Sequence, residues 1–312
     1  MTSASLDKRR PSSSRTVIEI VIVTHNSEQV IDALLDSIPA ASGDLSTRVV
    51  AVDCGSTDGT CARLRERDDC EVVETANVGY AAGINLGVET LGGSGPILVL
   101  NPDVRLHEHA VTEMVGALAD PAVGIVAPRV LEADGRPSLS LRREPSLGRA
   151  LGLSRTGAHR LTEKVSDPVA YSSAGVVDWA LGAALLVSRE CHDRLGGWDE
   201  SYFLYSEETD LCLRARDIGL VTRYVPTAVC THIGGGSGRS GRTHAMQVVN
   251  RVRLFRRRHG PLASALYFAL ITLGEVSWVV RGSAPSRTSL AALLLKRRRP
   301  AELGCSERLL PR

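Results

Sequence analysis

The sequence predicts an α/β fold in which a parallel sheet is covered by helices on both faces. Short apolar runs alternate with segments of helical periodicity through the first hundred residues, which is the pattern of βα units. Apolar residues make up 43% of the 312 residues, enough for a sizeable core. Small, polar or acidic residues follow each of the first four apolar runs, at the edge of such a sheet where ligands bind.

The first half of the chain contains four apolar runs, each separated from the next by a polar or helical segment. The runs predict buried strands at 17–23, 48–52, 71–74 and 97–100. Apolar side chains at helical spacing predict helices at 28–38, 57–67 and 81–91, the first ended by Pro39. This alternation is the basis for expecting parallel strands with helices between them.

The pattern is less regular after Asp103. It predicts helices at 108–118 and 208–218, and strands at 123–128, 177–187 and 221–225, the second of them interrupted by Gly182. No regular structure is predicted for 131–173, and the glycine-rich stretch at 234–241 predicts a flexible loop. No period of 20 to 50 residues repeats, which disfavours a solenoid.

Charge is unevenly distributed along the chain. The formal net charge is +2, but residues 251–299 contain eleven basic side chains and one acidic one, so this segment carries +10 and the remainder −8. A basic end on an acidic body indicates an anionic partner, which is a membrane surface, a nucleic acid or a phosphorylated substrate.

The basic end contains an apolar stretch at 262–280, nineteen residues with Glu275 as the one charged side chain. Its length approaches that of a membrane span, but basic residues flank it on both sides, whereas spanning helices have a one-sided bias. A helix that lies in the membrane interface, with Arg and Lys on anionic head groups, fits this pattern better. A helix packed on the rest of the protein is the alternative.

Neither the N-terminus nor the cysteines indicate secretion. Residues 1–16 are polar and serine-rich without an apolar segment, so they predict a flexible tail and no signal peptide. The seven cysteines are odd in number and include no C-x-x-C pair. This favours reduced thiols in the cytosol over a disulfide framework.

Polar segments follow the four predicted strands of the first half: THNSE at 24–28, DCGSTDGT at 53–60, NVGYAAGIN at 77–85 and NPD at 101–103. Turns and helix caps explain each segment alone, but four together favour a ligand site. Asp53 is a candidate acceptor of hydrogen bonds from a base or ribose. Asp103 is a candidate ligand for a divalent cation that holds a diphosphate, because hard cations take carboxylate oxygens. Gly55, Gly79 and Gly83 let a ligand approach the backbone closely.

A second cluster of acidic side chains, SEETD at 206–210, lies at the start of a predicted helix. The helix dipole alone accounts for carboxylates in the first turn. The functional interpretation is a general base, a group that takes a proton from a reacting hydroxyl. A carboxylate with a pKa raised by neighbouring charges suits that role.

These segments, in this order and spacing, resemble the inverting family 2 glycosyltransferases, which have the GT-A fold. The resemblance extends from residue 17 to about 238 and rests on VTHN, VDCGSTDGT, NVGYAAGINLG, LNPDV, GAALLV, GGWDESYFLYSEETDLCLRAR and HIGGGSG. Within the family the chain looks most like rhamnosyltransferases that add L-rhamnose to polyprenyl-diphosphate-linked N-acetylglucosamine in the arabinogalactan linker of the cell wall.

The resemblance implies an architecture. It is an α/β GT-A fold, with a Rossmann-like nucleotide half fused to an acceptor half around one mixed sheet, and a C-terminal helical membrane-associating tail. The expected divisions are a flexible tail at 1–16, the glycosyltransferase domain at 17–240 and a basic helical region at 241–312. The expected location is cytoplasmic, peripherally associated with the inner face of the cell membrane.

The resemblance also implies a role for each candidate residue. Glu208 stands where the family has its catalytic base, although the family usually has Asp there, and Asp103 matches the last Asp of the family's D-x-D, whose first position is Asn101 here. The metal is Mg²⁺ or Mn²⁺. The residues implied for the nucleotide sugar are Thr24, Asn26, Glu28, Asp53, Gly83, Asn85 and Asn101; for the metal, Asp103 and His232; for the acceptor side, Trp179, Trp198, Asp199 and Glu207.

The expected function is therefore transfer of a sugar, L-rhamnose from dTDP-L-rhamnose, to a hydroxyl of polyprenyl-diphosphate-linked N-acetylglucosamine. Another family 2 enzyme with a different donor or acceptor is the alternative. The segment THNSE replaces the G-x-G-x-x-G of a nicotinamide dehydrogenase and the glycine-rich basic loop of a pyrophosphorylase. From other classes, a nucleic-acid-binding module would use the basic tail, but that tail lacks interleaved aromatics. A catalytically inactive sugar-binding scaffold also stays open.

Overall fold

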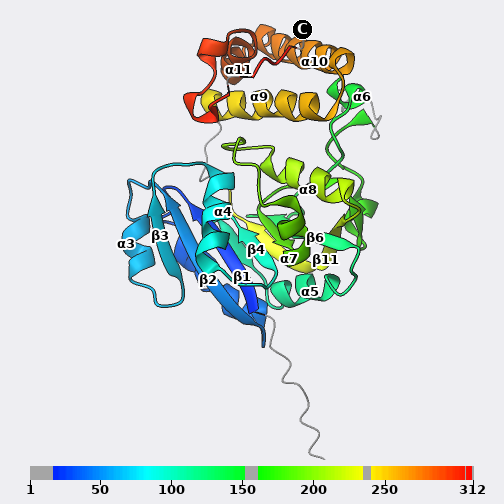
Figure 1. Cartoon of the computed structure of the whole chain (residues 1–312). Coiled ribbons are helices and arrows are strands. Elements are labelled where there is room, and N and C mark those ends of the chain that lie inside the picture. Colours follow the sequence, from blue (N-terminus) through cyan, green and yellow to red (C-terminus); the bar gives the residue numbers. More distant parts are fainter. Residues whose placement is uncertain (1–16, 152–160, 235–239, 306, 311–312) are drawn as a thin grey trace, which may run out of the picture.

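A mixed nine-stranded sheet forms the centre of the part of the chain that the structure describes (Figure 1). The structure is a computed structural model, and it describes residues 17–151, 161–234, 240–305 and 307–310. The predicted tail at 1–16 lies outside these residues. The strands are β1 Val17–Thr24, β2 Ser46–Cys54, β3 Glu71–Thr75, β4 Ile97–Leu100, β5 Val104–Leu106, β6 Val123–Glu132, β8 Gly175–Val177, β10 Ala184–Val187 and β11 Val221–His232, while β7 Leu141–Arg142 and β9 Trp179–Ala180 form a separate pair.

The sheet has a parallel half and a mixed half. Strands β3, β2, β1 and β4 are adjacent in that order and parallel, as the sequence predicts. Strand β10 then runs antiparallel to both β4 and β6, and β6 is parallel to β11. Strands β5 and β8 pair antiparallel with β11. The prediction of a parallel sheet is thus right for the first half of the sheet. The sheet as a whole is mixed, as the resemblance implied.

Helices cover both faces of the sheet because the strands of the parallel half are apolar on both sides. In β1, Ile18, Ile20 and Ile22 belong to one core and Val21 and Val23 to the other, as the period of two in a strand requires. The first core also contains apolar residues of α1 Ile31–Leu35, α2 Ile38–Ser42, α3 Thr60–Arg65 and α5 Ala110–Ala117. The second contains apolar residues of α4 Tyr80–Leu91, α7 Arg189–Leu195 and α8 Glu207–Asp217.

The predicted helix at 28–38 is wrong in its extent. Two short helices, α1 and α2, replace it, and Pro39 lies in the first turn of α2 instead of ending a helix. Proline is tolerated there because the first N–H groups of a helix have no partner within the helix. The stretch at 131–173 also contains structure that the sequence did not predict, namely β7, α6 Leu147–Ala150 and the 3₁₀ helix η3 Pro168–Tyr171.

The C-terminal region is helical, as predicted, and forms a layer above the carboxyl-end side of the sheet (Figure 1). It consists of α9 Gly241–Arg258, α10 Pro261–Val280 and α11 Ala284–Leu294, followed by the 3₁₀ helices η4 Lys296–Arg298 and η5 Ala301–Leu303. Ser240 begins α9 with a capping box in which its side chain and that of Thr243 bond reciprocally to the backbone. The predicted loop at 234–241 falls mostly on 235–239, outside the described residues.

Helix α10 is long and apolar enough, by length and composition, to cross a membrane. However, its one charged residue, Glu275, is buried inside the helical layer. The carboxylate of Glu275 lies 3.1 Å from His244 Nε2 and accepts a hydrogen bond of 2.5 Å from the Ser289 hydroxyl. Tyr267, Phe268 and Ile271 of α10 also pack into this layer, so one face of the helix is covered by protein.

Candidate functional site

A cavity of about 1280 Å³ separates the carboxyl ends of the central strands from the C-terminal helices. Thr24 at the end of β1, Asn101 after β4 and His232 at the end of β11 contribute to one wall, and Arg251 of α9 and Glu275 of α10 to the opposite side. The volume exceeds the roughly 300–1,000 Å³ of a typical small-molecule pocket, which leaves space for two substrates.

Asp53 organises the turn after β2 and does not line this cavity. It is buried, and its carboxylate accepts hydrogen bonds from the Thr24 hydroxyl at 2.9 Å and from the backbone N–H and hydroxyl of Ser56 at 2.8 and 2.5 Å. Burial alone would raise the pKa of Asp53, but the bonds from Ser56 and Thr24 outweigh it and lower the pKa. Thr24 itself lies in the cavity wall, and the predicted contact of Asp53 to a base stays a prediction.

The loop after β1 places Asn26 in the cavity wall and Glu28 beside it. Asn26 has a left-handed backbone with φ of 53°, a conformation that Asn tolerates better than most residues. Its side-chain oxygen accepts a hydrogen bond of 2.8 Å from the backbone of Thr57. Glu28 accepts one of 3.1 Å from the backbone of Gly59 and is not among the residues that line the cavity. Both side chains therefore fix the turn after β2.

Gly83 and Asn85 of α4 contact protein rather than the cavity. A Cβ atom at Gly83 would lie 2.9 Å from Val23, so glycine is needed for α4 to approach the sheet. The amide of Asn85 donates to the backbone oxygen of Trp198 at 2.9 Å and accepts from its N–H at 3.0 Å. The structure thus does not bring these two residues to the cavity, and their predicted contacts to a nucleotide sugar stay predictions.

Asn101 and Asp103 lie in the cavity wall after β4, each with one side-chain partner. The hydroxyl of Tyr80, at the start of α4, donates a hydrogen bond of 2.7 Å to the Asn101 side-chain oxygen. His232 Nε2, at the end of β11, lies 3.1 Å from a carboxylate oxygen of Asp103. This hydrogen bond raises the pKa of His232, although burial opposes the shift.

The donor chemistry of Asp103 and His232 fits a divalent cation. A carboxylate and an imidazole are ligands that Mn²⁺ accepts, and Mg²⁺ is commonly bound through one or two carboxylates plus substrate phosphates and water. Among the described residues there is no cluster of three or more acidic, His or Cys side chains arranged to hold a metal alone. A cation at Asp103 would thus need the oxygens of a bound diphosphate to complete its coordination.

Glu207 and Glu208 begin α8 and both line the cavity. One carboxylate oxygen of each is buried without a hydrogen-bond partner within the described part of the chain. Burial, together with the charge of Glu208, raises the pKa of Glu207 well above the usual range. Burial also raises the pKa of Glu208, but backbone N–H groups and the charge of Arg142 oppose this shift. Burial thus raises the pKa of both carboxyl groups, while backbone N–H groups and the charge of Arg142 favour the ionised form of Glu208.

The backbone before the two glutamates is in an unusual conformation. Tyr205 and Ser206 both have positive φ, of 69° and 76°, which is rare for residues other than glycine. Such backbone costs on the order of 1–3 kcal/mol per residue and persists only where its surroundings enforce it. Gly182 lies beside Glu208, and a Cβ atom at Gly182 would be 3.5 Å from the Cβ atom of Glu208.

Of the residues predicted for the acceptor side, Trp179 and Glu207 line the cavity, whereas Trp198 and Asp199 do not. The Trp179 indole donates a hydrogen bond of 3.0 Å to the Arg143 backbone. Asp199 is turned toward α9, where Arg257 donates to it at 2.8 Å. Burial would raise the pKa of Asp199, but bonds from Ser201 and the charge of Arg257 lower it.

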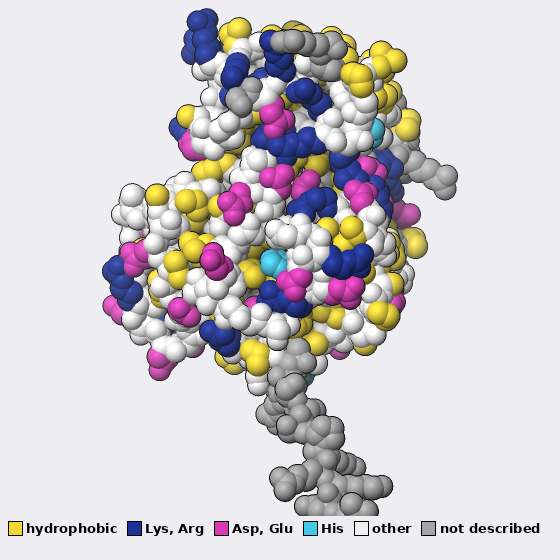
Figure 2. Space-filling view, in the orientation of Figure 1, with side chains coloured by type: hydrophobic (Ala, Val, Ile, Leu, Met, Phe, Trp, Pro, Cys, Tyr) yellow, Lys and Arg dark blue, Asp and Glu magenta, His cyan; other side chains and the backbone are white. Residues whose placement is uncertain are grey.

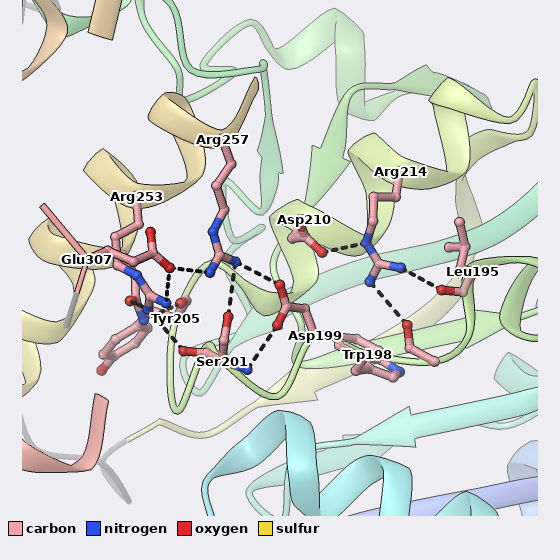
Figure 3. Close-up of polar contacts among 12 residues, drawn as sticks. Leu195, Trp198, Asp199, Ser201, Tyr205, Asp210, Arg214, Arg253, Arg257 and Glu307 are labelled. Carbon is pink, nitrogen blue, oxygen red and sulfur yellow. Dashed lines mark hydrogen bonds and ion pairs between the residues drawn. The ribbon is translucent and has the colours of Figure 1, made fainter. Parts of the chain in front are cut away.

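A polar network joins α9 to the loop that precedes α8 (Figure 3). Arg257 bonds to Asp199, to the Ser201 hydroxyl at 3.0 Å and to Glu307 at 2.6 Å. Arg253 donates to the Ser201 backbone oxygen at 2.9 Å. The C-terminal helices thus hold the loop that leads to Glu207 and Glu208 at the start of α8, which the sequence had not indicated.

Several residues that line the cavity were not predicted from the sequence to belong to the site: Tyr80, Arg142, Arg149, Lys164, Arg242 and Arg251. The aromatic residue in NVGYAAGIN was visible within a segment already singled out. Arg142 and Lys164 fall in the stretch for which no structure was predicted, where no motif marked them.

The family model with the description "Glycosyl transferase family 2" matches residues 19–179 of this chain. An N-acetylglucosaminyl-diphospho-decaprenol L-rhamnosyltransferase of Mycobacterium tuberculosis is 28% identical, over 92% of this chain and 97% of that protein. The rhamnosyltransferase WbbL of Escherichia coli is 24% identical, over 72% of this chain and 86% of its own length.

Among solved structures, a mannosyltransferase from Pyrobaculum calidifontis in complex with GDP-Man and Mn²⁺ has a TM-score of 0.57. It is 19% identical to this chain, and the match covers 95% of this chain and 85% of that one. The similarity, with the mixed sheet described above, confirms the predicted GT-A fold. GalNAc-T7, solved with UDP, GalNAc and Mn²⁺, has a TM-score of 0.55 at 15% identity, over 78% of this chain and 48% of that one.

Proposed function

As a member of glycosyl transferase family 2, this chain is a glycosyltransferase, and we propose that it is an inverting rhamnosyltransferase. It transfers L-rhamnose from dTDP-L-rhamnose to a hydroxyl of polyprenyl-diphosphate-linked N-acetylglucosamine. The rhamnosyltransferases to which it is similar support this choice of sugar. The relative that matches nearly the full length carries the acceptor in its name, which supports the choice of acceptor.

The proposed reaction is a single displacement with Glu208 as general base. The acceptor hydroxyl oxygen forms a bond to the anomeric carbon of the donor while the bond from that carbon to the diphosphate oxygen breaks. Glu208 takes the hydroxyl proton, and dTDP leaves with the electron pair of the broken bond. Attack opposite the leaving group inverts the anomeric configuration, and positioning of the hydroxyl supplies much of the rate.

The observation that carries this proposal is the position of Glu208 and Asp103 in the wall of one cavity. They are 105 positions apart in the sequence, yet one is suited to accept a proton and the other to hold a diphosphate through a cation. The roles of Thr24, Asn26 and Asn101 at the nucleotide sugar have the same support, because all three lie in that wall.

Asp103 and His232 would hold Mg²⁺ or Mn²⁺ in this proposal. Such an ion, when bound, supplies positive charge next to the leaving diphosphate. The 3.1 Å between His232 Nε2 and the Asp103 carboxylate shows that both side chains reach the same point in the wall. Asn101, where related enzymes have a carboxylate, contributes an oxygen held by Tyr80 without adding negative charge.

The proposed acceptor is a lipid, and the outer face of the helical layer is suited to an anionic membrane. Exposed apolar side chains lie beside exposed cations on this face (Figure 2). The exposed apolar side chains of this region are Leu262, Leu266, Leu273, Val276, Val280, Leu294 and Leu295, and the exposed cations are Arg281, Arg287, Lys296, Arg297 and Arg298. Because Glu275 is paired inside the layer, α10 lies on the surface of the bilayer with its inner face on protein.

We extend the proposal to domains and location. Residues 17–240 form the catalytic domain and 241–312 the membrane-associating region, with the enzyme at the cytoplasmic face of the cell membrane. A nucleic-acid partner has less support than the charge count suggested, because several tail arginines pair within the protein. Arg251 pairs with Glu163, Arg253 with Glu307 and Arg258 with Asp217.

One experiment tests the proposal directly. The full chain is incubated with a panel of nucleotide sugars and a short polyprenyl-diphosphate-GlcNAc, with and without Mg²⁺ or Mn²⁺, and the products are identified by mass spectrometry and NMR. We expect a rhamnosylated product of inverted configuration from dTDP-L-rhamnose, dependent on the cation. Turnover of a different nucleotide sugar in its place would refute the assignment of the donor.

A further inference from the structure

Two cations in the cavity wall have side chains on one face of a local β-bridge. Arg142, in β7, pairs with Lys164 in an isolated antiparallel bridge. Residues directly opposite each other in such a bridge point to the same side, and both residues line the cavity. Arg142 is half-buried and Lys164 is exposed, so the two charges are accessible from the cavity.

Within the described residues, neither cation has a carboxylate partner at ion-pair distance, whereas neighbouring cations of the wall do. Arg251 pairs with Glu163 at 2.5 Å, and Arg242 pairs with Glu302. Arg142 donates from one guanidinium nitrogen to the backbone oxygens of Leu139 and Leu141, which leaves its other nitrogens available. A half-buried cation without a counter-charge is unfavourable unless an anionic ligand supplies one.

Arg142, one member of the pair, lies beside the proposed base and beside Trp179, which is proposed for the acceptor side. The charge of Arg142 favours the ionised form of Glu208 and so opposes the rise in its pKa that burial causes. The Arg142 guanidinium also lies 5.9 Å from the centre of the Trp179 ring. In a diphosphate-linked sugar, one ring separates the attacking hydroxyl from the diphosphate. A cationic site next to Glu208 and Trp179 is therefore at the right place for that diphosphate.

We propose that Arg142 and Lys164 bind the diphosphate of the lipid-linked acceptor, apart from the donor diphosphate at Asp103. This inference rests on the proposed function for the identity of the acceptor. Arginine offers a planar fork to phosphate oxygens and lysine a compact charge, so together they span the two phosphate groups. The lipid then extends from the cavity toward the helical layer.

The test measures binding of a short prenyl diphosphate to the full chain with dTDP and Mg²⁺ present at saturation, so that the donor site is filled. Lys164→Met and Arg142→Lys are compared with Arg136→Met, which removes an exposed cation of the same segment that does not line the cavity. We expect Lys164→Met to weaken prenyl-diphosphate binding about 10- to 100-fold, as loss of charge-assisted hydrogen bonds does. Arg142→Lys should cost less, and Arg136→Met should bind as the wild type does.

The measurement of prenyl-diphosphate binding does not require turnover. Its result can therefore contradict this inference without contradicting the proposed function, and the reverse. If the wild type transfers rhamnose but Lys164→Met binds prenyl diphosphate normally, the inference is wrong and the function stands. If rhamnose transfer fails while Lys164→Met still weakens prenyl-diphosphate binding, the proposed diphosphate site is supported and the assignment of the donor is wrong. Loss of prenyl-diphosphate binding when dTDP is added would place that ligand in the donor site and overturn the inference. A parallel weakening of dTDP binding in Lys164→Met would overturn it too, because it would indicate general damage.

Discussion

The side-chain amide of Asn250 in α9 lies 3.0 Å from the backbone oxygen of Tyr205 and 3.0 Å from that of Leu204. Asn250 is fully buried, and Arg253 donates to its side-chain oxygen at 2.8 Å. The carbonyls that it holds belong to the turn with positive φ that precedes Glu207. A helix that is not part of the sheet or its covering layers therefore fixes the turn that leads to the candidate catalytic residues.

We predict that Asn250→Asp slows transfer more than it weakens substrate binding. The substitution keeps the shape but replaces the donor with an oxygen that repels both carbonyls, so the turn relaxes and Glu208 shifts. A displacement of about 1 Å lowers kcat about 10- to 100-fold. Steady-state kinetics on the full chain measure this, with thermal unfolding recorded in parallel.

Ser264→Ala is the matched control for Asn250→Asp. Ser264 is buried in the same helical layer, but its hydroxyl bonds to Gly260 and His259 and not to the catalytic loop. It should lose stability by about 0.5–1.5 kcal/mol and keep its kcat. Equal loss of kcat in both variants would mean that the layer contributes only overall stability.

Substitution by Gln should lower the activity at Glu208 much more than at the adjacent Glu207. Glu208→Gln removes the proposed base and should lower kcat by about 10²- to 10⁴-fold, with binding of dTDP-L-rhamnose unchanged. Glu207→Gln mimics the protonated form that burial and the charge of Glu208 favour, so it should retain activity within about fivefold. Rapid-quench measurement of product formation compares them. A result with the two variants exchanged would identify Glu207 as the base.

The pH dependence of kcat/KM should report the environment of Glu208. Because its pKa is raised by burial and the base must be ionised, activity should fall with decreasing pH at a midpoint above the usual glutamate value of about 4.3. The midpoint belongs to the coupled pair of glutamates. Arg142→Met removes a charge that lowers the pKa of Glu208, so the midpoint should move to higher pH, whereas Arg142→Lys should move it less. A downward shift in Arg142→Met would contradict the assigned base.

Much of the fold followed from local patterns, whereas the contacts of the C-terminal helices did not. The strand at 97–100 was predictable because a continuous apolar run is buried on both faces. The pairing of Asp199 with Arg257 was not, because 58 positions separate them and nothing local marks the contact. The resemblance implied that Asp199 lies on the acceptor side, whereas its carboxylate is turned to α9.

The candidate site was predictable where a strand end or a helix start places a residue in the cavity. Asp103 and Glu208 are of this kind, and both line it. Arg142 and Lys164 are not, because a bridge between two residues in an irregular stretch has no periodic signature. Gly83 and Asn85 do not line the cavity, and close packing and loop bonding require the same residue types as ligand contact, so their predicted contacts to a nucleotide sugar stay predictions.

The helical layer that carries the proposed membrane face contains its own fluorescent reporter. Of the three tryptophans, Trp278 in α10 is 49% exposed, while Trp179 and Trp198 are 7% and 3% exposed. Anionic vesicles should therefore shift the emission to shorter wavelength by burying Trp278 in the interface. The shift should weaken as salt increases, because it depends on Arg281 and the basic residues at 296–298. Vesicle titration followed by fluorescence measures both effects.

Trp278→Phe is the control, because it keeps an apolar aromatic side chain and removes the reporter. This variant should sediment with anionic vesicles as the wild type does but show no spectral shift, since Trp179 and Trp198 stay buried in protein. Arg297→Gln combined with Arg298→Gln should reduce sedimentation, at a cost of about 1 kcal/mol for each charge near the surface. If Trp278→Phe shows the same shift as the wild type, the signal comes from the catalytic domain, and the face of α10 is not the one that meets the lipid.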